Sequence, residues 1–465
     1  MTAALGIAVS SLQAETTAID VTAENVANAQ TPGYVAQSAS FAALPGGGSL
    51  GIGDGVEVTS IAQATDALLS TNSWQAQGAL SNLGSLQQTL GAIENVFPIA
   101  SAQGSPGASA TGTSSASIAG QLATFWSAWD AVAQDPSSAA PRVQVVDDAQ
   151  GLVAGLSEAA TQLAQITAGS QRDLADQVAQ VNTLLDQAAS LNASIVRTKG
   201  GGGNPNQLED QLRAVVGTLS ELAGVEVRTQ PDGSAMVSIG GVGLVQGASA
   251  GTLALETHGG SAAIVATPGS VTVPVGSGSI AGLLSTLNRY LPQYGSQLNA
   301  VADSLRTTVN TQLLSGYTAT GAAASSSPST HELFVGSGAA GLAVHPAIAA
   351  DPSLVAASST PGAAAANNGV NAQAMAELGT APGAPDALYQ SLVQNIGADT
   401  QSIQGQLDAQ TSVATQAQAA LQAVSGVDVT AQLTDLLGFQ QSYEASAKLL
   451  GVVDTTVQSL LQAVS

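Results

Sequence analysis

The chain has 465 residues, of which 45% are hydrophobic, so it can hold roughly two to four domains with buried cores. Only 9% of its residues are charged, compared with about 25% in ordinary soluble proteins. The chain has 32 acidic and 9 basic residues, so its formal net charge is -23. This argues against binding to nucleic acids or anionic membranes, which needs clustered Lys and Arg. Cysteine is absent, which excludes disulfides, thiolate metal sites and a Cys nucleophile.

The first predicted element is an N-terminal helix with an apolar residue at every seventh position. Proline restricts the residue before it to extended geometry, so this helix must end before Thr31-Pro32-Gly33, where we predict a tight turn. The first residues lack the basic segment and apolar core of a secretory signal, and no run approaches the roughly 20 apolar residues of a membrane span. The heptad stripe, which has the spacing of a helical seam, consists of Leu5, Leu12, Ile19 and Val26.

Long helices are predicted for the next part of the chain. Residues 41–61 form a Gly-rich link that we interpret as a hairpin or loop. In residues 62–97 apolar residues recur every three or four positions, which predicts a helix. Trp126 and Trp129 are expected in the core of a second helix. After Pro141 about 55 residues keep the helical period, a length of roughly 80 Å. Globular enzymes rarely need such a rod.

The period changes to two after Gly224. Short alternating segments between residues 225 and 275, separated by turn residues such as Pro231-Asp232-Gly233, predict a small β domain inserted in a helical protein. This domain covers residues 224–279, alone or together with residues 330–357.

The sequence predicts no catalytic, cofactor-binding or metal-binding residues. Residues 276–281 fit the glycine fingerprint of dinucleotide-binding proteins, but no second strand ending in a ribose-binding acid follows. His258, His331 and His345 lie in separate contexts without acidic neighbours at ligand spacing. We therefore expect a protein that is not an enzyme and that needs no cofactor.

A second heptad stripe closes the chain, and matched heptads at both ends predict that the terminal helices pair as a coiled coil. The fold class is thus mainly α with an inserted small β domain, built as a long helical bundle. The predicted domains are a terminal coiled coil (residues 1–40 and 425–465), a helical rod with loops (41–223 and 280–424) and the β domain. The second stripe consists of Leu436, Tyr443, Leu450, Val457 and Val464.

Three segments carry a resemblance to a known family. Residues 25–34 resemble the Asn-x-Ala-Asn-x-x-Thr-Pro-Gly-Tyr signature of flagellar rod, hook and hook-associated proteins, and residues 438–448, with Phe439 and Gln440, resemble the run that closes the hook-associated members. A third segment is also similar to the hook-associated branch: it contains Leu208, Asp210 and Arg213 and continues through the predicted strands up to residue 246. The signature positions are Asn25, Asn28, Thr31, Pro32, Gly33 and Tyr34.

The resemblance implies a structural subunit at the junction between hook and filament, exported through the flagellar channel without a cleaved signal and located outside the cell. It implies self-association in a tubular ring, contact with the hook protein and a second junction protein, and an export chaperone at the C-terminal helix. The two heptad stripes would form the assembly interface, ordering against neighbouring subunits. The alternatives are a hook or distal-rod protein, or a secreted adhesin with a helical stalk that binds a glycan through residues 224–279.

Overall fold

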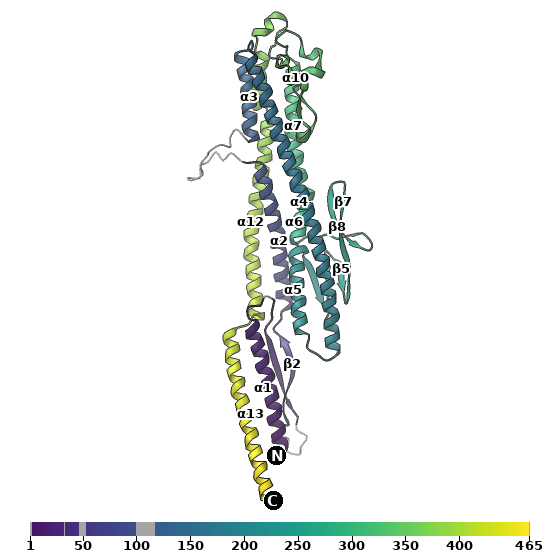
Figure 1. The fold of residues 1–465 in the computed structure, drawn as a ribbon, viewed down its shortest axis with the longest axis vertical. Coiled ribbons are helices and arrows are strands. Elements are labelled where there is room, and N and C mark those ends of the chain that lie inside the picture. Colours follow the sequence, from purple (N-terminus) through teal and green to yellow (C-terminus); the bar gives the residue numbers. More distant parts are fainter. Residues whose placement is uncertain (1, 32, 46–52, 99–116, 465) are drawn as a thin grey trace.

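The computed structural model describes the chain apart from residues 1, 32, 46–52, 99–116 and 465. The molecule is an elongated helical rod with a narrower two-helix coil at one end and a β domain on one flank (Figure 1). This arrangement confirms the predicted fold class, including the contact between the terminal helices. Pro32 and the link over residues 99–116 lie outside the described residues.

The narrow end is the terminal coil, formed by α1 (Thr2–Asn28) and α13 (Val429–Val464). A hairpin of β1 (Gln37–Leu44) and β2 (Gly55–Gln63) packs on α1, with antiparallel register from Gln37 opposite Gln63 to Leu44 opposite Gly55. Its tip, residues 46–52, lies outside the described residues. The hairpin begins four residues before the predicted link and ends two residues after it.

The rod is a bundle of long helices that share a continuous apolar core. Trp129 is completely buried and Trp126 is 7% exposed, which confirms their prediction as core residues. α4 runs for 62 residues without a break, a length of about 93 Å. The rod helices are α2 (Ala67–Val96), α3 (Ile118–Gln134), α4 (Ala139–Gly200), α5 (Asn206–Ala223), α6 (Gly278–Ser285), α7 (Leu291–Leu314) and α12 (Pro385–Ser425), with a π-helical turn (Thr286–Tyr290) between α6 and α7.

The β domain lies against α4 as two small antiparallel sheets (Figure 1). One sheet has the strand order β3-β4-β5-β6 and the other β7-β8-β9. The strands are β3 (Val225–Thr229), β4 (Ala235–Ile239), β5 (Val242–Gln246), β6 (Ser249–Ala250), β7 (Thr252–His258), β8 (Ser261–Thr267) and β9 (Val271–Thr272).

Two details of the sequence prediction need correction. The helix expected from residue 62 begins at Ala67, because Ala62 pairs within the hairpin and Asp66 caps the helix by accepting hydrogen bonds from the backbone amides of Leu68 and Leu69. Residues 330–357 do not join the β domain. Their strands β10 (Phe334–Val335) and β11 (Ala343–Val344) form a sheet of their own, among short helices at the end of the rod opposite the coil (Figure 1).

Asparagines on the helices attach these small sheets, and two of them, Asn192 and Asn310, are buried. Asn192 on α4 donates to the carbonyl oxygen of Ala235 at 2.7 Å and accepts from its backbone amide at 2.8 Å. Asn182 on α4 clamps Leu253 in the same way, at 2.9 and 2.7 Å. Each amide offers one donor and one acceptor to a single strand residue, as a neighbouring strand would. The same arrangement joins Asn288 to Ala262 and Asn310 to Phe334.

Replacing Asn192 by Ala should lower the free energy of unfolding by about 1–3 kcal/mol, because the buried polar groups of Ala235 lose their partner. Urea unfolding with a fluorescence or circular dichroism readout measures the change. Gln187→Ala, an exposed change on the same helix, is the matched control and should leave the midpoint in place. Equal midpoints for both variants would contradict a clamping role.

Candidate assembly site: the elbow between coil and rod

The terminal coil consists of two antiparallel helices in direct contact (Figure 1). The hydroxyls of Ser11 and Ser446 are 2.8 Å apart, and Asn25 donates to the side-chain oxygen of Gln432 at 2.8 Å. Ser11 and Asn25 are as far apart along α1 as Gln432 and Ser446 are along α13. The two contacts therefore agree on one antiparallel register for the coil.

The structure spreads the predicted stripe residues over two environments. Leu12, Ile19, Val26, Leu436 and Leu450 are half-buried. The remaining ones point more to solvent, and small side chains such as Ala14 and Ala18 form the tightest part of α1. The side chain of Val464 lies outside the described residues. The exposed stripe members are Leu5 (45%), Tyr443 (41%) and Val457 (38%).

A second apolar face on α13 was missed by the heptad count. Leu437 and Val452 are 60% and 63% exposed. They are 15 residues apart, close to four helical turns, so they share a face, and at 100° per residue this face points away from the half-buried Leu436 and Leu450. A helix that is apolar on both faces needs contacts beyond its α1 partner.

The elbow (residues 25–37) turns the chain out of α1 into the hairpin. The backbone amide of Thr31 donates to the carbonyl of Asn28 at 2.8 Å, and the Thr31 hydroxyl donates to the Asn28 side chain at 3.2 Å. Gly33 has a φ of 80°, in the left-handed region that favours glycine. A backbone bond of 2.9 Å from Ala36 to the carbonyl of Ser425 then ties the elbow to the end of α12.

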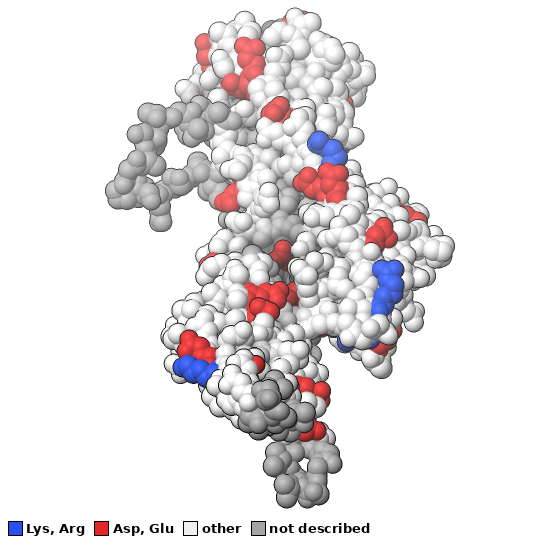
Figure 2. Space-filling model, turned by 60° about the horizontal axis from the view of Figure 1, so that its bottom comes forward, with Lys and Arg blue, Asp and Glu red and all other residues white. Residues whose placement is uncertain are grey.

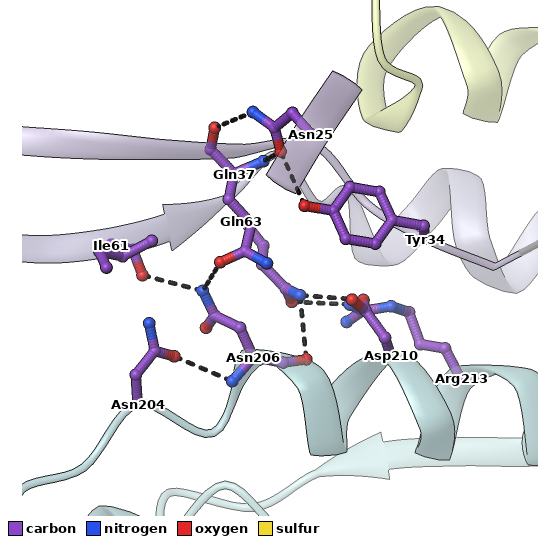
Figure 3. Close-up of polar contacts among 9 residues, drawn as sticks. All are labelled: Asn25, Tyr34, Gln37, Ile61, Gln63, Asn204, Asn206, Asp210 and Arg213. Carbon is purple, nitrogen blue, oxygen red and sulfur yellow. Dashed lines mark hydrogen bonds and ion pairs between the residues drawn. The ribbon is translucent and has the colours of Figure 1, made fainter. Parts of the chain in front are cut away.

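Asn25 is the centre of this turn, and its side chain is completely buried. Its amide nitrogen donates to the Gln37 carbonyl at 2.7 Å and to Gln432 on α13 at 2.8 Å. Its amide oxygen accepts from the Tyr34 hydroxyl and from the Gln37 backbone amide, each at 2.9 Å (Figure 3). Both donors and both acceptor positions are therefore used. One side chain joins α1, the turn, the hairpin and α13.

The network continues from the hairpin into α5. Asn206 donates to the Gln37 side chain at 2.9 Å and to the Ile61 carbonyl at 3.0 Å (Figure 3). Gln63 donates to Asp210 at 2.9 Å and accepts from Arg213 at 2.6 Å. Asp210 and Arg213, which belong to the family-like run, also form an ion pair with each other. Two of the three family-like segments, residues 25–34 and the run with Asp210 and Arg213, thus meet at one place although they are far apart in sequence.

Burial perturbs two titratable groups of this network. It raises the pKa of Asp210, although the Arg213 guanidinium opposes the shift. Burial, together with the negative charge of Glu24, raises the pKa of Tyr34 to about 12. Both side chains belong to the hydrogen-bond network that joins the coil to the rod. We therefore assign them a structural role. A groove of about 1120 Å³ beside the elbow, lined by Tyr34, Trp74 and Gln418 among others, has mixed polar and apolar walls.

The partners of Asn25 were not found from the sequence. Gln37, Gln63, Asn206 and Gln432 are ordinary polar residues in a chain rich in Gln and Asn, and nothing in their spacing marks them. Of the two family-motif residues predicted on α13, Phe439 lies half-buried with its ring centroid 6.3 Å from that of Phe41, and Gln440 is exposed.

Other kinds of site receive no support from the described residues. They contain no group of three His, Cys, Asp or Glu side chains placed to hold a metal ion, and none of their helices is long and apolar enough to cross a membrane. Charged side chains are sparse and scattered over the face shown in Figure 2. This surface fits contacts made by apolar and amide side chains.

Three family models match the chain. Residues 5–34 match the model of the flagella basal body rod protein, and residues 417–463 match the C-terminal model of the flagellar basal body rod FlgEFG proteins. Residues 109–326 match the flagellar hook-associated protein FlgK helical domain. The chain therefore carries domains of the flagellar rod and hook axial protein family, which confirms the resemblance of its motifs.

Within this family the chain is similar to flagellar hook-associated protein 1. It is 26% identical to that protein from Escherichia coli (strain K12) over 337 residues, which cover 69% of this chain and 59% of the relative. The protein of the same name from Bacillus subtilis (strain 168) is 24% identical over 50% of this chain and 45% of the relative. The E. coli and Salmonella typhimurium matches thus span less than three-fifths of those relatives.

The fold is shared with a solved structure. The flagellar hook junction protein FlgK from Burkholderia pseudomallei aligns with a TM-score of 0.60 at 18% identity, over 77% of this chain and all of that one.

Asn25→Asp should weaken the elbow, because a carboxylate accepts hydrogen bonds but cannot replace the two donated ones; the expected loss is about 1–3 kcal/mol. Hydrogen exchange should become faster in α13 and β1, while the middle of α4 stays protected. Gln13→Glu introduces the same charge on the exposed face of α1 and serves as control. Unchanged exchange in α13 would show that Asn25 does not hold the coil.

The raised pKa of Tyr34 predicts an alkaline loss of stability. Between pH 10 and about pH 12 the unfolded state releases this proton while the folded state keeps it. The free energy of unfolding therefore falls as the pH rises through this window. Burial also raises the pKa of Tyr389 to about 12, so Tyr34→Phe and Tyr389→Phe should each reduce the slope in urea titrations, and the double variant should reduce it most. A slope that is the same in all variants would contradict the assignment.

Proposed function

We propose that this chain is a structural, non-enzymatic subunit of the bacterial flagellum, located outside the cell at the junction between hook and filament. The observation that carries the proposal is the apolar outer face of α13, where Leu437 and Val452 are 60% and 63% exposed. Exposed apolar surface of this kind marks an interaction site. The family matches at both ends of the chain and over its helical domain support the same conclusion.

The geometry suggests a division of labour. The terminal coil (residues 1–40 and 425–465) would pack with the coils of neighbouring subunits in a tubular ring, through the two heptad stripes and the outer face of α13. The rod (residues 41–223 and 280–424) would form the rigid part between the elbow and the end opposite the coil. The β domain (residues 224–279) lies on the flank of α4, so it would face outward.

The partners follow from this place in the flagellum. The ring would contact the hook protein on one side and a second junction protein on the other, and an export chaperone would cover the C-terminal helix before assembly. α13 could bind first the chaperone and then neighbouring subunits, because Leu433, Leu437 and Val452 remain exposed when α13 contacts α1. The match over residues 109–326 favours a hook-associated subunit over a hook or distal-rod protein.

Deletion of residues 433–465 should leave a folded rod that cannot join the hook. Circular dichroism and urea unfolding of the purified truncated chain should show the helical core intact, whereas cells with only this chain should make hooks without filaments and release flagellin. Leu437→Gln with Val452→Gln, which keeps the helix, should give a weaker form of the same defect, and Gln440→Ala is the control. Normal filaments on cells that carry only the truncated chain would refute the proposal.

A further inference from the structure

The charges of the terminal coil and its hairpin are strongly unbalanced. Residues 1–64 and 426–465 contain nine acidic residues and one base, Lys448. In the part of the chain that the structure describes, Lys448 forms no ion pair; the four that occur involve other bases. Packing such coils side by side would bring like charges together, so the position of this base matters for assembly.

Lys448 lies on the outer face of α13. It is exposed and follows Leu437 by 11 residues, about three helical turns, and it precedes Val452 by one turn. The lysine therefore stands within the apolar face that has no partner in the monomer. Because of the Ser11 and Ser446 contact, Lys448 is level with Val9 of α1.

A cleft with the opposite character opens between α1, the hairpin and α13. It has a volume of about 340 Å³, and its lining includes the apolar side chains of Phe41, Val56 and Phe439 together with the acids Glu15 and Asp435. One carboxylate oxygen of Glu15 is buried and has no hydrogen-bond partner among the described residues. Burial also raises the pKa of Glu15, and no cation opposes the shift. A buried carboxylate without a partner is costly.

We propose that Lys448 of one copy of this chain inserts into this cleft of a neighbouring copy. Its methylene groups would pack on Phe41 and Phe439, and its ammonium group would lie between the carboxylates of Glu15 and Asp435. A long apolar stem with a charged end suits a cleft with apolar walls and two acids. We call the cleft the lysine socket.

The lysine of the same copy does not fill the socket. Glu15 is six residues along α1 from the level of Lys448, about 9 Å, and Lys448 points to the outer face of α13. A neighbour displaced along the coil by about this distance brings the two together. Because the lysine and the socket are different surfaces, the contact is head-to-tail and continues around a ring or helix. Each copy has one unpaired base in its coil and one socket, which favours a second copy as the occupant.

This inference rests on the proposed function only in requiring that copies assemble side by side. Since the chain contains no cysteine, Lys448→Cys with Glu15→Cys can be tested by treating flagella isolated from cells that carry the variant with a bis-maleimide that spans about 10 Å, because the length of the inserted lysine keeps the two Cα atoms beyond the roughly 7 Å that a disulfide can bridge. We expect a ladder of covalent oligomers on a non-reducing gel, and monomers from either single variant. Lys448→Cys with Asp20→Cys, which uses an exposed acid on α1, is the matched control and should give no ladder.

A second measurement uses charge alone. Lys448→Gln should reduce the amount of this protein at hook ends at least about thirtyfold, as expected when one partner of a desolvated ion pair is removed, while urea unfolding of the purified chain stays unchanged. Exchanging the charges, with Lys448→Glu and Glu15→Lys together, should restore part of the loss.

The outcomes separate the two proposals. Absence of the wild-type chain from hook ends would overturn both the function and the socket. If the wild-type chain is present there, three results would overturn the socket alone: no ladder from the Lys448 and Glu15 pair, a ladder from the Asp20 control instead, or a cross-link of Lys448→Cys to a different protein. Full assembly of Lys448→Gln would overturn it as well.

Discussion

The relation between the coil and the rod depends on one buried amide, that of Asn25. Its two donated and two accepted hydrogen bonds connect four segments of the chain, so none of them can move alone without leaving a polar group unsatisfied. The angle at which the chain leaves α1 is thereby tied to the position of α13. In the proposed tubular assembly, this coupling would keep the terminal coil and the outer domains at defined places.

The same chemistry recurs throughout the molecule. With 9% charged residues the chain has few ion pairs to use, and the described residues contain four. Asparagines on helices take their place by clamping single strand residues, as Asn192 does with Ala235. An amide provides a donor and an acceptor without the desolvation cost of a buried charge. It also stays the same over a wide range of pH and salt, which suits a structure exposed to the surroundings of the cell.

Much of the fold could be predicted, because hydrophobic period and turn residues are local signals. The long helix after Pro141, the strands between residues 225 and 275 and the contact of the terminal helices all follow from them. The elbow network could not be predicted, since Gln37, Asn206 and Gln432 meet only through tertiary packing. The heptad count identified α1 and α13 but overlooked Leu437 and Val452, because it searches for one seam and α13 has apolar residues on two faces.

The two faces of α13 also explain how a subunit can be stable enough to keep its shape and still be ready to assemble. On the inner face Leu436 and Leu450 are only half-buried, so the contact with α1 buries little apolar area per residue. In the proposed assembly the outer face would be buried by other subunits, so most of the stability of the coil would arrive with assembly. An isolated two-helix coil of this composition is marginal, whereas the rod has its own continuous core. In the proposed assembly the elbow would thus separate a rod with its own core from a coil that becomes fully ordered among its neighbours, and the buried amide at this boundary would determine the direction in which the coil is presented to them.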